Sequence, residues 1–199
     1  MAQRDDHAGR RRVRRHSPPV RPLTSADLSP LLAGSIDPGL LPMTWAEAAL
    51  DEWGFCGVGC VSDGLLTGYL LVAPALHVPR PHPLAACANA DAAALLAVVD
   101  DGCGRRLVQS LAARLVGHRT ITAIDAAASE LGTALAPSYT WLDEVGFHPL
   151  DQDPNRYRLE LAGTRSWLPD VAPLLDRLRG IIRPVPPPEP VGRYESARS

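Results

Sequence analysis

The sequence offers its clearest chemistry at a glycine-containing turn. Ala93–Val99 is an unbroken apolar run, and Gly102 and Gly104 follow it closely. Apolar residues then recur at helical spacing, at Leu107, Val108, Leu111, Leu115 and Val116. This pattern predicts a buried strand, a glycine turn and an amphipathic helix.

A turn of this kind leaves the first N–H groups of the helix unpaired, at the positive end of the helix dipole. It can therefore bind an anion such as a pyrophosphate. Leu107 stands where the dinucleotide fingerprint has its third glycine, and the Lys and Ser/Thr of a P-loop are missing. By spacing alone, the two glycines more often mark a tight reversal of the chain than an anion site.

The order of the surrounding segments resembles the GNAT superfamily of N-acetyltransferases. The segments are GRRLVQSLAARL, the strand-like TITAIDAAA, SYTWLDEVGF and YRLEL. In that family a strand, a Gly-rich turn and a helix bind acetyl-CoA, and a later helix ends in a Gly-Phe pair, here Gly146 and Phe147. The resemblance covers residues 20–161, and the stretch up to Pro190 is similar to the tail of a high-GC bacterial subgroup.

The resemblance implies an α+β fold of the GNAT type, with a mixed, mostly antiparallel sheet of six to seven strands and helices on both faces. Around it we expect a disordered basic tail over residues 1–19, the GNAT-like domain over 20–162, a C-terminal helical extension over 163–183 and a Pro-rich tail over 184–199.

Acetyl-CoA is the co-substrate that the resemblance implies, with its pyrophosphate on the turn and its pantetheine arm between two splayed middle strands. The residues assigned to donor binding, most of them through backbone N–H groups, are Ala97, Val98, Val99, Gly102, Cys103, Gly104, Arg105 and Arg106. The acetyl thioester is expected near residues 126–129.

The turn departs from the family pattern. Val99 stands where the family has Arg or Gln, and the turn is short. Asp100 and Asp101 precede the helix, where an Asp can cap the free N–H groups and where two carboxylates repel a diphosphate. Arg105 and Arg106 would attract one. An Asp bonded into the turn would remove the open phosphate site, and we would then expect the transferase interpretation to fail.

The catalytic residues are less clearly marked. In many family members a Tyr four residues before the Gly of the Gly-Phe pair acts as the general acid, and here that residue is Leu142. Tyr139, one turn earlier, is the candidate general acid. Glu47 is the candidate base, with Asp125 and Glu130 as further candidates by location.

The leading hypothesis is transfer of an acetyl group from acetyl-CoA to an unidentified primary amine, on a small molecule or a protein. The alternative is a catalytically inactive GNAT-like scaffold, or protein-interaction module, that has lost acetyl-CoA binding. Val99, the aspartate pair and Leu142 favour this alternative. The sequence leaves the oligomeric state open.

Charge is divided unevenly along the chain. Six of the 20 basic residues, all of them Arg, lie in residues 1–16, which leaves 14 Arg against 20 acidic residues in the remainder. An Arg-rich head can bind nucleic acid, but without interleaved aromatic residues a solvated tail is the better interpretation.

The four cysteines form no C-x-x-C pair, and we expect Cys56, Cys60, Cys87 and Cys103 to be buried, reduced thiols of a cytoplasmic protein. No apolar run approaches the roughly 20 residues of a membrane span, so no membrane partner is expected. His77 and His82 are expected to face solvent, with no metal site.

Local patterns predict the remaining elements. They are a strand over 20–23, a helix capped by Thr24 with Asp27, a helix over 44–53 capped by Thr44, a hairpin of 55–62 and 65–73 around Asp63-Gly64, a strand over 119–126, a helix over 137–145, strands over 147–149 and 156–161, and a helix from Ser166.

Overall fold

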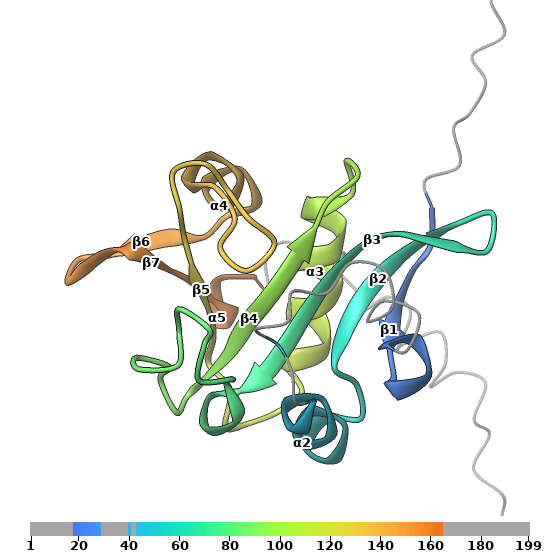
Figure 1. Ribbon diagram of the computed structural model, residues 1–199, viewed down its shortest axis with the longest axis horizontal. Helices are drawn as coiled ribbons and strands as arrows, with labels where there is room; N and C mark the ends of the chain where they lie inside the picture. The colour runs from blue at the N-terminus through green and yellow to red at the C-terminus, as the bar shows by residue number, and fades with distance from the viewer. Residues whose placement is uncertain (1–17, 29–39, 41–42, 165–199) are drawn as a thin grey trace, which may run out of the picture. The chain divides into compact units, whose positions relative to one another are not determined.

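The computed structural model describes residues 18–28, 40 and 43–164 (Figure 1). The predictions for the basic head, the helix from Ser166 and the Pro-rich tail concern residues outside these ranges.

Seven strands form one sheet in the order β1-β2-β3-β4-β5-β7-β6. The strands are β1 Val20–Leu23, β2 Gly57–Ser62, β3 Leu65–Pro74, β4 Ala92–Val99, β5 Ala123–Ala127, β6 His148–Leu150 and β7 Asp153–Glu160. Only the β4–β5 pair is parallel; the other pairs in this sheet are antiparallel. The predicted α+β fold with a mixed, mostly antiparallel sheet is confirmed.

The helices are α2 Thr44–Trp53, α3 Gly104–Leu115, α4 Tyr139–Val145 and α5 Leu161–Thr164, with a short 3-10 helix, η2, at Ala75–His77. The apolar stripe of α3 is buried as its spacing predicts: Leu107, Val108, Leu111 and Leu115 lie in the core. Figure 1 shows α3 (light green) passing behind β3 and β4. The sheet and this stripe form the core that fixes the start of α3 at the end of β4.

Several local predictions are confirmed by backbone geometry. Asp63 and Gly64 have φ of 52° and 80°, as a two-residue hairpin turn requires. The Asp27 carboxylate accepts the Thr24 N–H at 2.9 Å, so the predicted capping arrangement is present. Gly146 ends α4 with φ of 99°, the left-handed conformation that favours glycine there.

Other predicted boundaries are displaced. Thr44 is not the cap of α2, because it is the first residue of the helix. The N-cap residue is Met43, and it makes no capping side-chain hydrogen bond. Strand β5 begins at Ala123 rather than at residue 119. Helix α4 begins at Tyr139 rather than at residue 137, since the Ser138 hydroxyl accepts the Trp141 N–H and caps it. The last two strands are β6 and β7 as given above, rather than 147–149 and 156–161.

Strand β4 leaves β5 halfway along its length. Its pairing with β3 shifts register, with Leu71 opposite Ala97 and Val72 opposite Leu95, so that Leu96 forms a bulge. The parallel pairing with β5 ends at Leu95 and Ala126. Residues 96–99 of β4 therefore have no partner on β5, and we call this part of the sheet the fork.

Candidate functional site

The turn that begins α3 is closed by a carboxylate. Gly102 has φ of 79°, and Cys103 is the N-cap residue without a capping side chain of its own. The Cys103 N–H instead donates to Asp100 Oδ1 at 2.7 Å, and Trp141 Nε1 donates to Asp100 Oδ2 at 2.8 Å. An Asp is therefore bonded into the turn, as the self-capped alternative expects, and the Cys103 N–H is not free for a phosphate in this structure.

Neither Arg105 nor Arg106 offsets the negative charge of the Asp100 carboxylate, because each guanidinium group binds elsewhere. Arg105 Nη2 donates to the Glu144 carbonyl at 3.1 Å, at the end of α4. Arg106 Nη2 donates to the Pro18 carbonyl at 2.6 Å, just before β1. Arg105 is exposed and Arg106 is half-buried, so both guanidinium groups bind backbone carbonyls of other elements.

The free edge of β4 at the fork is also paired within the chain. The Val98 N–H donates to the Ala134 carbonyl at 2.8 Å, in the segment between β5 and α4. The Leu96 carbonyl lies 3.1 Å from His82 Nε2. Ala97 and Val99 pair with β3 on the other side. The strand edge predicted to bind pantetheine thus has partners of its own.

His82 is buried, with 3% of its surface exposed, and the prediction of a solvent-facing residue is wrong. Its Nδ1 accepts the Leu84 N–H at 3.1 Å, so the proton belongs on Nε2, which donates to the Leu96 carbonyl. Burial lowers the pKa of His82, and hydrogen bonds to the backbone of Leu96 and Leu135 oppose that shift. His77 is exposed as expected, and the described residues contain no cluster that could hold a metal.

The structure does not bring the proposed acid and base together. The Tyr139 hydroxyl donates to Asn155 Oδ1 at 2.7 Å, and the Tyr139 ring lies 6.0 Å from that of Tyr157. Leu142 is fully buried in the core. Glu47 is exposed in the first turn of α2, and no hydrogen bond or ion pair in the described ranges joins it to Tyr139.

Asp125, the second carboxylate considered as a base, is the centre of a buried ion cluster. Its Oδ2 accepts from Asn89 Nδ2 at 2.7 Å and lies 3.3 Å from Arg156 Nη2, while Oδ1 lies 3.5 Å from Arg158 Nε. Arg158 also pairs with Asp91 and Glu160. The side chain of Asp125 is 1% exposed, so its partners hold it as an ion pair that supports β5 and β7. The remaining candidate base, Glu130, is exposed.

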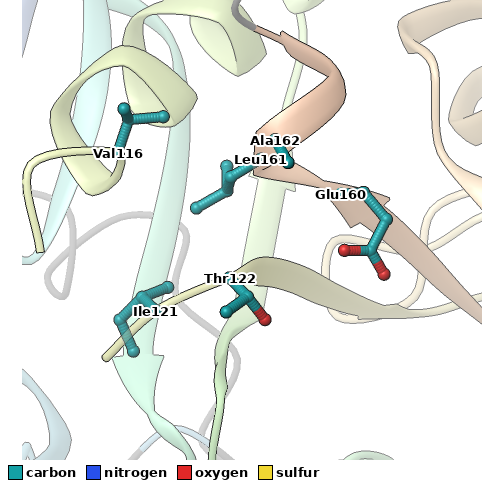
Figure 2. Close-up of a pocket in the computed structure, with 6 residues that line it drawn as sticks. All are labelled: Val116, Ile121, Thr122, Glu160, Leu161 and Ala162. Carbon is teal, nitrogen blue, oxygen red and sulfur yellow. The ribbon is translucent and has the colours of Figure 1, made fainter. Parts of the chain in front are cut away.

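Several cavities of the described residues lie outside the turn and the fork, and two of them border β7. One of about 290 Å³ lies over the Asp125 cluster, between Asn89, residues 150–153, Arg156 and Arg158. Figure 2 shows another, of about 270 Å³, which is lined by Val116, Ile121, Thr122, Glu160, Leu161 and Ala162. The latter lies past the last residue of α3, and 12 helical residues, about 18 Å, separate it from the turn.

The cysteines are free thiols, as predicted. Cys56, Cys60 and Cys103 are buried, whereas Cys87 is half-buried, contrary to the expectation for that residue. Burial raises the pKa of Cys56 and of Cys103 to about 12, which leaves both thiols protonated at neutral pH. None of the helices in the described ranges is long and apolar enough to cross a membrane.

One parallel pair, β4 and β5, which the glycine turn and α3 connect, in an otherwise antiparallel sheet is the fold of the GNAT acetyltransferases. The crystal structure of aminoglycoside acetyltransferase AAC(6')-Ib in complex with coenzyme A matches with a TM-score of 0.50 and 14% identity, over 75% of this chain and 98% of that chain. An acetyltransferase assigned to the GNAT family from Desulfovibrio desulfuricans matches with a TM-score of 0.45 and 17% identity, over 72% and 98% of the two chains. At 14% identity the match to AAC(6')-Ib establishes the fold alone. The sequence matches no protein-family model and no curated protein.

The contacts that close the site were not visible in the sequence. Asp100 was recognised as a possible cap because of its position before the helix. Trp141, Ala134 and His82 were missed, because each acts through a partner distant in sequence. The long stretch between β5 and the Gly-Phe helix was the signal that could have indicated Ala134.

Proposed function

We propose that this chain is an acetyl-CoA-dependent N-acetyltransferase that acts on a primary amine and whose donor site is closed in the free protein. One observation carries the proposal: β4 parts from β5 after Leu95 and runs directly into the glycine turn and α3. This provides a strand edge for a linear amide-containing arm and a helix N-terminus for a diphosphate. AAC(6')-Ib, which shares the fold, was solved with coenzyme A.

In the closed arrangement the residues do not fit the donor. The carboxylate of Asp100 occupies the Cys103 N–H where a diphosphate would bind, and the Ala134 carbonyl occupies the Val98 N–H where an amide of the pantetheine would bind. Donor binding therefore requires that both groups move away. Asp100 is exposed, which allows its side chain to rotate into solvent.

The free-energy cost of breaking these hydrogen bonds decides whether the closed arrangement abolishes acetyl-CoA binding or weakens it. A hydrogen bond to a carboxylate contributes about 1.5–3 kcal/mol and a neutral one about 1 kcal/mol. Breaking the two bonds to the Asp100 carboxylate, from Cys103 and Trp141, and the one between Val98 and Ala134 costs about 4–7 kcal/mol, a factor of roughly 10³–10⁵ in affinity. A site with a Kd near 1 μM when open would then bind with a Kd of about 1 mM or weaker. The sequence-based criterion that a bonded Asp ends the transferase interpretation is therefore too strict, and we expect weakened binding instead.

The second candidate is the inactive scaffold, and the same two contacts favour it. Asp100 and Ala134 satisfy the groups that a donor would use, and Leu142 replaces the tyrosine expected in many family members.

In the transferase, Tyr139 as acid would first have to leave Asn155, and Glu47 as base would act on the acceptor side. We expect catalysis to come mainly from positioning of donor and acceptor.

Calorimetric titration of the full chain with acetyl-CoA tests the proposal. We expect weak binding by the unmodified chain and at least tenfold tighter binding by Asp100→Ala. Asp101→Ala is the matched control, because it removes the same charge from an exposed residue without a hydrogen bond to the Cys103 N–H. Absence of binding by Asp100→Ala at about 2 mM acetyl-CoA would support the scaffold instead, because in this variant only the bond between Val98 and Ala134 still has to break and its Kd should be about 10 μM.

A further inference from the structure

Residues 129–138, which we call the strap, form a compact loop held together by its own hydrogen bonds. The Ser129 hydroxyl donates to the Ala136 carbonyl at 2.8 Å and accepts the Gly132 N–H at 3.1 Å. The Thr133 N–H donates to the Ala136 carbonyl at 2.7 Å, and the Ala136 N–H donates to Thr133 Oγ1 at 3.0 Å. The strap therefore keeps its shape through internal bonds as well as through contacts with the sheet.

The two ends of the strap lie beside each other. Ser129 and Ser138 form an isolated parallel bridge, and the Ser129 N–H donates to the Pro137 carbonyl at 3.1 Å. Ser138 is also the cap of α4, and β5 ends two residues before Ser129. Close ends and internal packing are the features of an Ω-loop, and a loop whose ends are fixed beside each other can move without moving the strand and helix that it joins.

The middle of the strap lies in the fork. The Ala134 carbonyl takes the Val98 N–H, and Leu135 packs against the core. Leu131, by contrast, is 94% exposed. One part of the strap thus supplies to β4 the backbone acceptor that β5 no longer provides, while another part projects into solvent.

His82 braces the same place from the loop before β4. Its Nε2 donates to the carbonyl of the bulged residue Leu96, two residues from Val98, and the ring also hydrogen-bonds the backbone of Leu135 in the strap. The exposed edge of β4 is therefore paired by a side chain at Leu96 and by the strap at Val98. The contacts of the strap with Val98 and His82 have to break for a linear ligand to reach Val98.

We propose that the strap is an internal occupant of the donor channel, which leaves the fork when acetyl-CoA enters and returns when coenzyme A departs. This inference rests on the proposed function and adds its regulation. Apparent donor affinity then equals the intrinsic affinity of the open fork multiplied by the fraction of molecules with the strap out. Changes in the strap that touch no donor atom should therefore change donor affinity.

Three variants test whether the strap leaves and re-enters the fork, a movement that we call the gate. In the first, a six-residue Gly-Ser segment replaces residues 130–137, which shortens the strap by two residues and leaves chain enough to rejoin the parallel-paired Ser129 and Ser138. The second, Ser129→Ala, removes two internal bonds of the strap and changes no main-chain length. The control is Leu131→Ser at the exposed tip. We measure the calorimetric Kd for acetyl-CoA and, without ligand, the hydrogen-exchange rate of the Val98 amide.

We expect the shortened strap to bind acetyl-CoA at least tenfold more tightly, Ser129→Ala about threefold more tightly and Leu131→Ser unchanged. The Val98 amide should be protected in the unmodified chain and exchange at least tenfold faster in the shortened one. Equal affinities for the unmodified and shortened chains would overturn the gate and leave the proposed function standing. If the shortened strap does not fold, an unchanged Kd for Ser129→Ala overturns it. Lack of binding by every variant, with Val98 protected, would instead overturn the proposed function and the gate together.

Discussion

The indole of Trp141 donates from Nε1 to Asp100 Oδ2 at 2.8 Å, and so ties the middle of α4 to the turn before α3. Without this bond Asp100 would be held only by the Cys103 N–H. The bond matters for function because it fixes the carboxylate in the position that a diphosphate would need.

Trp141→Phe keeps a half-buried aromatic ring packed against the core and removes the indole N–H. Loss of one hydrogen bond to a carboxylate, worth about 1.5–3 kcal/mol, should free Asp100 and tighten acetyl-CoA binding about threefold to tenfold. In the Asp100→Ala background the same change should have almost no effect, because the two residues act as one unit. Additive effects in this double-mutant cycle would show that Trp141 does not act through Asp100.

Gly104 lies against both members of this pair. A Cβ there would collide with Asp100 Oδ2 and approach Trp141 Nε1 to 2.9 Å. Gly104→Ala should therefore separate Asp100 from Trp141 and lower the free energy of unfolding by about 1–2 kcal/mol in a denaturant titration. The cost should shrink in the Asp100→Ala background. Gly117→Ala is the control, because its nearest neighbour, the Arg114 carbonyl, lies at an ordinary 3.5 Å.

His82 should make stability depend on pH. Burial lowers its pKa in the fold, so below the unfolded value of about 6.5 the unfolded chain binds more protons than the folded one. Stability should then fall as the pH falls from about 7 towards 5, and above about 7 this contribution should be complete. Protonation of Nδ1 would also break its bond with the Leu84 N–H.

Thermal unfolding between pH 7 and pH 5 checks this sign. His82→Gln, which does not titrate, should lose part of the decrease in Tm that the unmodified chain shows. His77→Gln, at an exposed position, should keep the unmodified slope. The same slope in all three proteins would mean that His82 is not responsible.

The Asp125 cluster should be structural. Asp125→Ala leaves Arg156 and Arg158 partly buried without their shared carboxylate, and we expect a loss of about 3–5 kcal/mol in unfolding free energy. Asp91→Ala, whose carboxylate is 53% exposed, should cost less than about 1 kcal/mol. A stable Asp125→Ala protein with no acetyltransferase activity would instead assign Asp125 to catalysis.

Much of the fold could be predicted from the sequence because it follows from local patterns. The apolar run before Gly102 became the buried strand β4, and the period of Leu107, Leu111 and Leu115 became the buried stripe of α3. Asp63-Gly64 and Gly146 adopt the positive φ values that their turn and helix end require. Each of these features depends on residues within a few positions of one another.

The state of the site depended on contacts that no local pattern contains. Asp100 could be recognised as a cap from its place before the helix, but Trp141, which completes it, lies 41 residues away. His82 was expected in solvent because the loop around it is rich in proline, yet it is buried against β4. The partner of a backbone group at a strand edge is decided by whichever segment the completed sheet brings there, and at Val98 this is the strap. The sequence therefore determined a strand, a turn and a helix suited to an anion, whereas only the tertiary structure decided that the chain's own groups fill them, because non-local hydrogen bonds form only after the sheet has assembled.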